Sequence, residues 1–270
     1  MSGLGPCAEA CPERVGVSGT RRDTCAVVVA GGSGERFGDP RGKQYVDLCG
    51  LPLACWSLIA LDRSPSIGHI VVVCAADHRR EMREDVISRL RLRCEVTIAE
   101  GGATRQDSVR SGLAAVPEDF GLVAIHDAAR PLIQPVSVER AIACVRDDAG
   151  AGGAICAARV TDTLKLVEDA SIVATPDRSF YWSAQTPQVF RTAQIVAAHK
   201  AAARDKYLGT DDASLIERSG ARVVCVETPR DNLKVTLPED LLIARALLQS
   251  RLAVDGCGLD LLDLNEGDSL

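Results

Sequence analysis

The sequence lacks the features that mark membrane-spanning, secreted and nucleic-acid-coating proteins. No apolar stretch approaches the ~18–20 residues that a membrane span requires. The N-terminus has no basic segment followed by an apolar one, so we expect no secretory signal. Positive charge is scarce as well, since 31 Lys and Arg stand against 37 Asp and Glu, a formal net charge of −6. We therefore expect neither a membrane nor a nucleic acid as a partner, although a local basic cluster could still bind phosphate.

The sequence also lacks any C-x-x-C pair, although it holds 11 cysteines. Most of them stand singly in apolar runs, as Cys25, Cys74 and Cys156 do. Only Cys7 and Cys11 lie close together, and no Cys/His pair follows them at zinc-finger spacing. This usage is typical of reduced thiols in a cytoplasmic protein.

Short apolar runs alternate with amphipathic stretches along the 270 residues, which suffice for one large domain. A continuous apolar run is typical of a strand buried on both faces. Such runs cover Cys25–Ala30, Ile70–Ala75, Val96–Ala99, Leu122–Ile125, Ala154–Ala157 and Val223–Val226. Helical patterns cover Pro52–Leu61, His78–Leu90, Asp107–Ala115, Val136–Arg146, Ala193–Ala203, Asp211–Arg218 and Pro238–Leu252. The alternation predicts an α/β fold with a doubly wound, mostly parallel, Rossmann-like sheet, whose ligands bind beyond the carboxyl ends of the strands.

Three segments depart from the alternation. Residues 159–183 lack a helical signal and predict a β-ribbon with a turn near Glu168–Ala170. An isolated ribbon is only marginally stable, so we expect a projecting β-arm that packs on a second subunit. Residues 1–23 are rich in Gly, Ser, Pro and charge and predict a disordered lead-in, and residues 253–270 predict a loose acidic tail.

The first candidate site is the glycine-rich loop Ala30-Gly-Gly-Ser-Gly-Glu-Arg-Phe37, directly after the first predicted strand. It is neither a P-loop nor a dinucleotide fingerprint, because Phe37 takes the place of the third glycine of G-x-G-x-x-G. Glycines let backbone N–H groups approach a ligand, and Arg36 and Lys43 on the same loop could neutralise a triphosphate. An ordinary glycine turn is the alternative.

Two further candidate sites follow later strands. The stretch from Glu100 to Ser108 combines glycines, a hydroxyl and an arginine at a helix start, which could hold a base and a phosphate; a capped helix start explains it equally well. In His126-Asp-Ala-Ala-Arg-Pro131, Asp127 could hold Mg²⁺ and Arg130 a second phosphate, unless Asp127 merely caps the next turn. We expect His126 to be structural, because phosphoryl transfer needs no imidazole here.

A fourth group is spread along the chain and supplies cations and hydroxyls for another phosphate-bearing ligand. It comprises Thr163, Lys165, Arg178, Thr186 and the run Asp231-Asn-Leu-Lys234.

These motifs, in this order, resemble the 2-C-methyl-D-erythritol 4-phosphate cytidylyltransferases of the non-mevalonate isoprenoid pathway, from about Cys25 to Arg251. The matching segments are the glycine loop with Lys-Gln-Tyr45, His-Asp-Ala-Ala-Arg-Pro131, Asp-Thr-Leu-Lys165, Gln-Thr-Pro-Gln188 and Asp-Asn-Leu-Lys-Val-Thr236. The resemblance implies a nucleotidyltransferase domain over residues 24–252. It also implies a reaction that joins CTP to a small sugar-alcohol phosphate and releases pyrophosphate, with Mg²⁺ as cofactor.

The resemblance further implies residue roles. Arg36, Lys43 and Lys234 would be catalytic, acting on the reacting phosphates. Ala30, Gly31 and Gly32 would wrap the CTP phosphates, Gly102 and Ser108 would lie by cytosine and ribose, Ala128 by the ribose, and Asp127 at the Mg²⁺. Arg130, Thr163, Arg178 and Thr186 would surround methylerythritol phosphate. Because the family takes Thr163 and Arg178 from the partner's arm, the site would need a homodimer.

One departure and three alternatives remain at this stage. Many relatives carry an acidic residue where this chain has Ala103, so a side-chain contact to the nucleotide would be missing. A ribitol 5-phosphate cytidylyltransferase would share the nucleotide half of the site, although the run from Asp162 to Lys165 favours methylerythritol phosphate. A non-catalytic nucleotide-binding module would usually lose the loop cations, and an NAD(P)-dependent oxidoreductase would need the missing glycine.

Overall fold

A seven-stranded sheet forms the centre of the protein in the computed structural model, which describes residues 21–32, Phe37 and residues 41–255. Its order is β11-β7-β10-β6-β1-β4-β5. The strands are β1 (Thr24–Val29), β4 (Ile67–Cys74), β5 (Glu95–Glu100), β6 (Leu122–Asp127), β7 (Ala151–Arg159), β10 (Trp182–Arg191) and β11 (Arg222–Glu227). Each of the six apolar runs singled out in the sequence coincides with one of these strands, and only Ala30 and Ala75 lie one residue beyond a strand end, so that prediction is confirmed.

The sheet is mostly parallel, as predicted. β1 pairs in parallel with β4 and β6, β4 with β5, and β11 with β7. The exception is β10, which the sequence did not predict and which runs antiparallel between β6 and β7. Its centre holds the cis bond Thr186–Pro187, and the pairing with β7 shifts between Ala184 and Gln188. The proline makes this strand hard to predict from the sequence, because prolines are uncommon in central strands.

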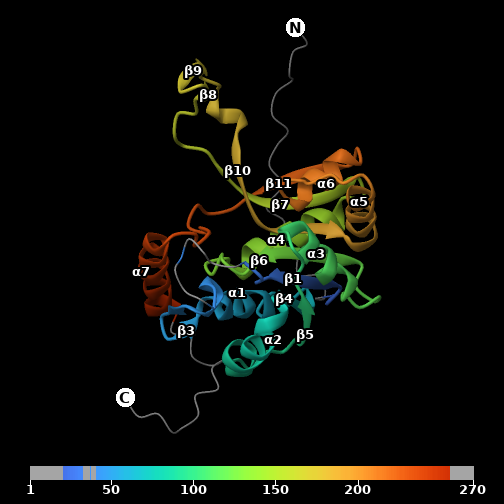
Figure 1. The fold of residues 1–270 in the computed structure, drawn as a ribbon, viewed down its shortest axis with the longest axis vertical. Helices are drawn as coiled ribbons and strands as arrows, with labels where there is room; N and C mark the ends of the chain where they lie inside the picture. The colour runs from blue at the N-terminus through green and yellow to red at the C-terminus, as the bar shows by residue number, and fades with distance from the viewer. Residues whose placement is uncertain (1–20, 33–36, 38–40, 256–270) are drawn as a thin grey trace.

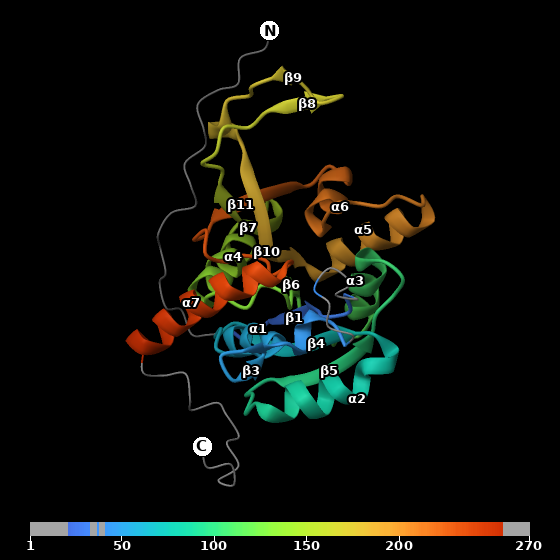
Figure 2. The ribbon, with the colours of Figure 1, turned by 60° about the vertical axis from the view of Figure 1, so that its left-hand side comes forward.

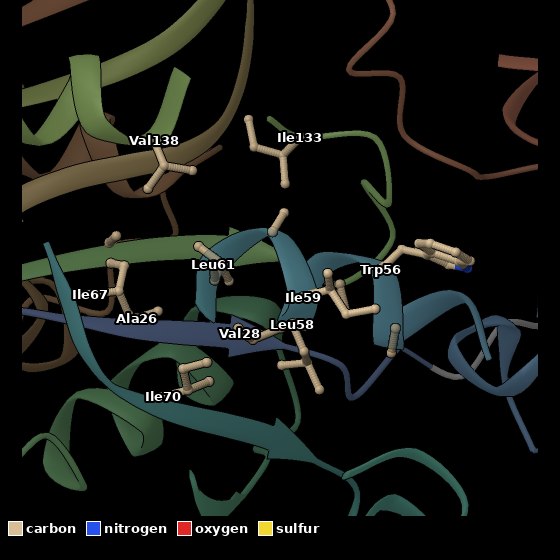
Figure 3. Packing of buried hydrophobic residues seen from close by; sticks show 14 of the residues in the cluster. Ala26, Val28, Trp56, Leu58, Ile59, Leu61, Ile67, Ile70, Ile133 and Val138 are labelled. Atoms are coloured by element: carbon tan, nitrogen blue, oxygen red, sulfur yellow. The ribbon is translucent and has the colours of Figure 1, made fainter. Parts of the chain in front are cut away.

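Helices cover both faces of the sheet (Figure 1). The side chains of α3 (Arg105–Ala114), α5 (Thr192–Arg204) and α6 (Asp212–Arg218) pack in one apolar cluster, on one face. Those of α1 (Leu53–Asp62), α4 (Pro135–Asp147) and α7 (Pro238–Asp255) pack in a second cluster, on the other face. Figure 3 shows part of the second cluster, where Leu58 and Leu61 of α1 lie beside Ala26 and Val28 of β1. The predicted doubly wound architecture is therefore confirmed.

The segment expected to form one regular helix over His78–Leu90 is irregular instead. It passes from a 3-10 turn (Ala76–His78) through α2 (Arg79–Glu81) into a π-helical turn (Met82–Val86) and another 3-10 turn (Ile87–Arg89). Its buried side chains, Met82, Val86 and Leu90, recur every four residues. Positions i, i+4 and i+8 share one face of a helix, so the segment keeps one buried face although its winding is irregular.

A two-stranded ribbon projects from the top of the molecule (Figures 1 and 2). It consists of β8 (Leu166–Glu168) and β9 (Ser171–Ala174), and every residue of both strands is exposed. Asp169 and Ala170 form the turn with positive φ angles of 45° and 61°, so the predicted arm and its turn are confirmed. Its packing on a second subunit stays a prediction.

The remaining elements are small. A hairpin of β2 (Asp47–Leu48) and β3 (Leu51–Pro52) precedes α1.

α7 runs to Asp255, beyond the predicted boundary at residue 252. The expectations for residues 1–20 and 256–270 lie outside the described residues. Within the described part of the chain, no helix has the length and apolar character needed to cross a bilayer.

Candidate functional site

A cavity of about 370 Å³ opens at the carboxyl ends of β1 and β6. This is where a parallel sheet places its ligands. Most of the predicted nucleotide-site residues line it: Ala30, Gly31, Gly32, Lys43, Gly102, Ser108, Asp127, Ala128 and Lys234. Val29, Gln44, Ala103, Thr104, Arg105 and Ala129 complete the lining. Arg36, the other predicted cation, lies outside the described residues.

Two lysines reach the cavity from opposite ends of the chain. Lys43 follows Gly42, whose φ of 98° lies in the region that favours glycine. The Nζ atom of Lys43 donates to the carbonyl of Val235 at 2.8 Å, and the N–H of Val235 donates to Ala129 O at 2.8 Å. These bonds hold the loop that carries Lys234 against the end of β6, so the predicted convergence of the two lysines on one cavity is confirmed.

The carboxylate at the centre of the site belongs to Asp127, the last residue of β6. Its Oδ1 accepts from Arg105 Nε at 3.0 Å and its Oδ2 from Lys234 Nζ at 2.8 Å. Burial acts to raise the pKa of Asp127, but the charges of Arg105 and Lys234 outweigh it and hold the pKa well below the usual range. Asp127 is therefore ionised at any physiological pH, and its side chain does not act as a helix or turn cap.

Arg105 stands in the second candidate site, but sequence reasoning missed its bridging role. Its Nη1 donates to Asp212 Oδ2 at 2.8 Å, so one guanidinium bridges two carboxylates. Arg105 begins α3, where a positive charge faces the positive end of the helix dipole. A cation in that position needs nearby anions, and this mismatch is the signal that could have identified it.

The segment before α3 caps the helix and also lines the cavity. Thr104 caps the helix, because its Oγ1 accepts from Asp107 N at 3.0 Å. Ser108 Oγ meanwhile accepts from Gly102 N at 3.1 Å and fixes the loop that lines the cavity. A Cβ on Gly102 would come within 2.4 Å of Asp107 Cβ, so only glycine fits the loop there.

The oxygen ligands available for a metal are few. Among the described residues, Asp127 is the only carboxylate that lines the cavity, and no cluster of three or more His, Cys, Asp or Glu is able to hold a metal. Mg²⁺ commonly binds through one or two carboxylates together with substrate phosphates. The donor set therefore fits a cation that arrives with a polyphosphate, and it does not fit an all-protein metal cage.

His126 and Thr186 lie behind Asp127, away from the cavity lining. Asp127 N donates to Thr186 Oγ1 at 3.1 Å, and that hydroxyl lies 3.0 Å from His126 Nδ1. The other ring nitrogen, Nε2, lies 3.3 Å from Arg130 O. Complete burial lowers the pKa of His126 to about 4, so the ring is neutral and can donate through Nε2 while Nδ1 accepts. His126 is thus placed as a structural residue, as expected.

The residues predicted for the second ligand do not line the cavity within one chain. Arg130 is half-buried and donates to Asn232 O at 2.8 Å. Thr186 is buried behind Asp127, while Thr163 and Arg178 are exposed at the base of the arm, where Arg178 donates to Thr161 O. One chain therefore brings together the nucleotide side of the predicted site and leaves the arm residues apart from it.

Known proteins resemble this chain in sequence and in structure. A family model described as 2-C-methyl-D-erythritol 4-phosphate cytidylyltransferase matches residues 24–250. The protein of that name from Syntrophotalea carbinolica is 43% identical over 225 residues, which cover 83% of this chain and 95% of that one. The one from Geobacter metallireducens is 40% identical over 230 residues, which cover 84% and 98%.

Solved structures give the same result. The crystal structure of 4-diphosphocytidyl-2C-methyl-D-erythritol synthase from Anaerococcus prevotii has a TM-score of 0.74 at 26% identity and covers 84% of this chain and 96% of that one. The 2-C-methyl-D-erythritol 4-phosphate cytidylyltransferase from Thermus thermophilus has a TM-score of 0.68 at 28% identity and covers 83% and 98%.

Proposed function

The chain belongs to the 2-C-methyl-D-erythritol 4-phosphate cytidylyltransferase family, and on that premise we propose that it joins CTP to 2-C-methyl-D-erythritol 4-phosphate and releases pyrophosphate. The observation that carries the proposal is the cavity itself, where glycine backbone, two lysines and one carboxylate meet at the end of the sheet. A nucleoside triphosphate needs this combination of backbone donors and cations.

The acceptor phosphate attacks the α-phosphorus of CTP, a new P–O bond forms, and pyrophosphate leaves in line. The nucleophile is already an anion at neutral pH, so no general base is required. The described part of the cavity agrees with this, because the titratable residues that line it there are Lys43, Arg105, Asp127 and Lys234. Asp127, with its lowered pKa, is too weak a base to abstract a proton near pH 7.

Charge is the obstacle that the site must overcome, because two polyanions have to meet. Among the described residues, three cations line the cavity against one carboxylate, Asp127, so this part of the lining carries a formal excess of two positive charges (three minus one). Lys43 and Lys234 would stabilise charge that grows on the reacting phosphates, and Arg36 would join them from the glycine loop. Gly102 and Ser108 would contact cytosine and ribose, and Ala128 would lie by the ribose.

We assign Asp127 as the residue that would hold Mg²⁺ together with the CTP phosphates. When bound, the cation supplies further charge neutralisation between the phosphates. The chain's own part is to present one ionised, oriented carboxylate, which the two cations on Asp127 support.

A homodimer would complete the acceptor side. The arm exposes an apolar surface made of Leu166, Val167, Ile172, Val173, Phe180 and Tyr181. A ribbon with such a surface gains stability by packing on a partner. Arg130 and Thr186 would then approach the acceptor from one subunit, and the partner's Thr163 and the partner's Arg178 from the other.

The test is a pyrophosphate-release screen of CTP, UTP, ATP and GTP, each with 2-C-methyl-D-erythritol 4-phosphate and with ribitol 5-phosphate. We expect turnover with CTP and the methylerythritol acceptor. Faster turnover with ribitol 5-phosphate would show that this compound is the acceptor, and no pyrophosphate release with any pair would refute the proposed enzymatic activity.

We also place the protein in the cytoplasm, which is supported by eight described cysteines that are all unpaired.

A further inference from the structure

Charged side chains continue from the cavity into the interior of the protein. Lys234 contacts Asp127, Asp127 contacts Arg105, and Arg105 contacts Asp212. The series ends at His199 on α5, whose Nε2 lies 3.2 Å from Asp212 Oδ1. Asp212 and His199 are each only 1% exposed, so the inner half of the series is shielded from water.

The two cations on Asp127 are held very differently. Arg105 is tied at both ends, with Nε on Asp127 and Nη1 on Asp212. The Nζ of Lys234 contacts only the Asp127 carboxylate among the described residues, and its side chain is 41% exposed. The exposed ion pair of Lys234 with Asp127 is therefore weak. The pair of Arg105 with the buried Asp212 is held more firmly, because breaking it would leave an unpaired charge in the interior.

Asp212 is itself fixed in place. It begins α6, and that helix start is bonded to β10, since Ala213 N donates to Gln188 Oε1 at 3.0 Å and Gln188 Nε2 donates to Asp211 Oδ2 at 2.8 Å. With Arg105 on one oxygen and His199 on the other, the carboxylate of Asp212 has no freedom to follow a ligand. The guanidinium of Arg105 is therefore anchored to the sheet through α6.

We propose that Arg105 and Asp212 are positioning residues for Asp127, an inference that rests on the proposed function. Arg105 keeps Oδ1 of Asp127 fixed, while Lys234 is the partner that exchanges. When a nucleotide enters, Lys234 moves to the phosphates and uncovers Oδ2, the oxygen with which Asp127 would hold Mg²⁺. Asp212 acts only through Arg105 and touches no reacting atom. Oriented outer-shell carboxylates of this kind commonly set metal affinity.

The test compares Asp212→Asn with Asp62→Asn by calorimetric titration of CTP into the dimer, with and without Mg²⁺. Asp62 is a matched control: it is fully buried and pairs with Arg93 at 3.2 Å, but it does not line the cavity. Loss of an outer-shell partner typically costs about 10–100-fold in metal affinity. We expect Asp212→Asn to weaken Mg²⁺-CTP by about tenfold or more, to change metal-free CTP much less, and to leave the KM for the acceptor unchanged.

Asp62→Asn should lower the melting temperature and leave both CTP affinities as in the wild type. Equal Mg²⁺-CTP affinities in Asp212→Asn and the wild type would overturn the proposal, as would an equal loss in the two Asn variants. If Asp212→Asn does not fold, Arg105→Lys replaces it, because a lysine cannot bridge two carboxylates as a guanidinium does; wild-type Mg²⁺-CTP affinity there would also overturn it. A wild-type enzyme that binds Mg²⁺-CTP but releases no pyrophosphate would refute the proposed function alone.

Discussion

The proposed sharing of the site between two subunits makes a prediction that can be tested by pairing two inactive subunits. Arg178 lies on the exposed arm and does not line the cavity of its own chain, whereas Lys43 does. Arg178→Ala should raise the KM for the acceptor about 10–100-fold, as expected for one lost charged hydrogen bond of about 1.5–3 kcal/mol, and leave the KM for CTP nearly unchanged. Lys43→Ala should lower kcat by about 10²–10³.

The heterodimer of these two variants should regain activity. One of its two sites combines the intact cavity of the Arg178→Ala subunit with the intact arm of the Lys43→Ala subunit. With one whole site of two, kcat/KM for the acceptor per dimer should reach about half of the wild-type value. Co-expression with two different tags and tandem purification isolates the heterodimer, and pyrophosphate release at low acceptor concentration measures it.

The control pairs Lys43→Ala with Lys234→Ala. Both lysines line the same cavity of one chain, so every site of that heterodimer lacks one cation and activity should stay low. An inactive Lys43→Ala/Arg178→Ala heterodimer would refute the shared site, because a site built within one chain gives no rescue. Equal recovery of activity in both heterodimers would show that Lys43 and Lys234 do not act together on one site.

Three other predictions concern single residues. Lys43→Ala should unfold at nearly the wild-type temperature despite its loss of turnover, since one hydrogen bond is worth only about 1 kcal/mol. The control, Lys200→Ala on the exposed side of α5, should change neither the melting temperature nor kcat. If Lys43→Ala does not fold, the assignment of Lys43 as a catalytic residue is contradicted. Because burial lowers the pKa of His126 to about 4, the unfolded state binds more protons between that pKa and the ordinary value near 6.5, so falling pH destabilises the native state by up to about 3 kcal/mol over this range. Urea unfolding of wild type and His126→Asn at several pH values measures that difference, and parallel pH profiles would disprove it. Burial raises the pKa of the Cys25 thiol to about 12, so iodoacetamide should label Cys225, which is exposed, in the native protein and Cys25 only after unfolding; peptide mass spectrometry would reveal native labelling of Cys25 if this is wrong.

The sequence predicts the inner parallel strands because they are buried on both faces, and it predicts the partly exposed edge strands β5 and β11 from their short apolar runs. β1, with the sequence Thr-Cys-Ala-Val-Val-Val, is continuous in hydrophobicity and cannot be confused with a surface strand. β10 escapes the same reasoning, because Trp-Ser-Ala-Gln-Thr-Pro-Gln begins exposed, carries polar side chains and contains a proline. Its central place is set by the pairing with β6 and β7, which local sequence does not encode.

The candidate site divides in the same way. Lys43, Asp127 and Lys234 could be predicted because each stands in a short motif, and the fold brings them together as expected. Arg105 stood in a candidate segment, but its bridge to Asp212 could not be predicted, because Asp212 is 107 residues away and the two residues meet only in the folded protein. The pairing of a helix start with a buried carboxylate far away in the sequence depends on tertiary structure and cannot be inferred from local sequence.

The ion pairs of Asp127 explain how the protein can keep a cluster of cations ready before any ligand arrives. Lys43, Arg105 and Lys234 would repel one another in a cavity that is partly shielded from water. Asp127 pairs with Arg105 and Lys234 and offsets one unit of this charge, and Lys43 is bonded to a backbone carbonyl. An incoming triphosphate therefore replaces existing partners, and does not have to gather charges from solvent. This exchange needs one cation that can leave Asp127 and one that cannot, which is the difference that the structure builds between Lys234 and Arg105.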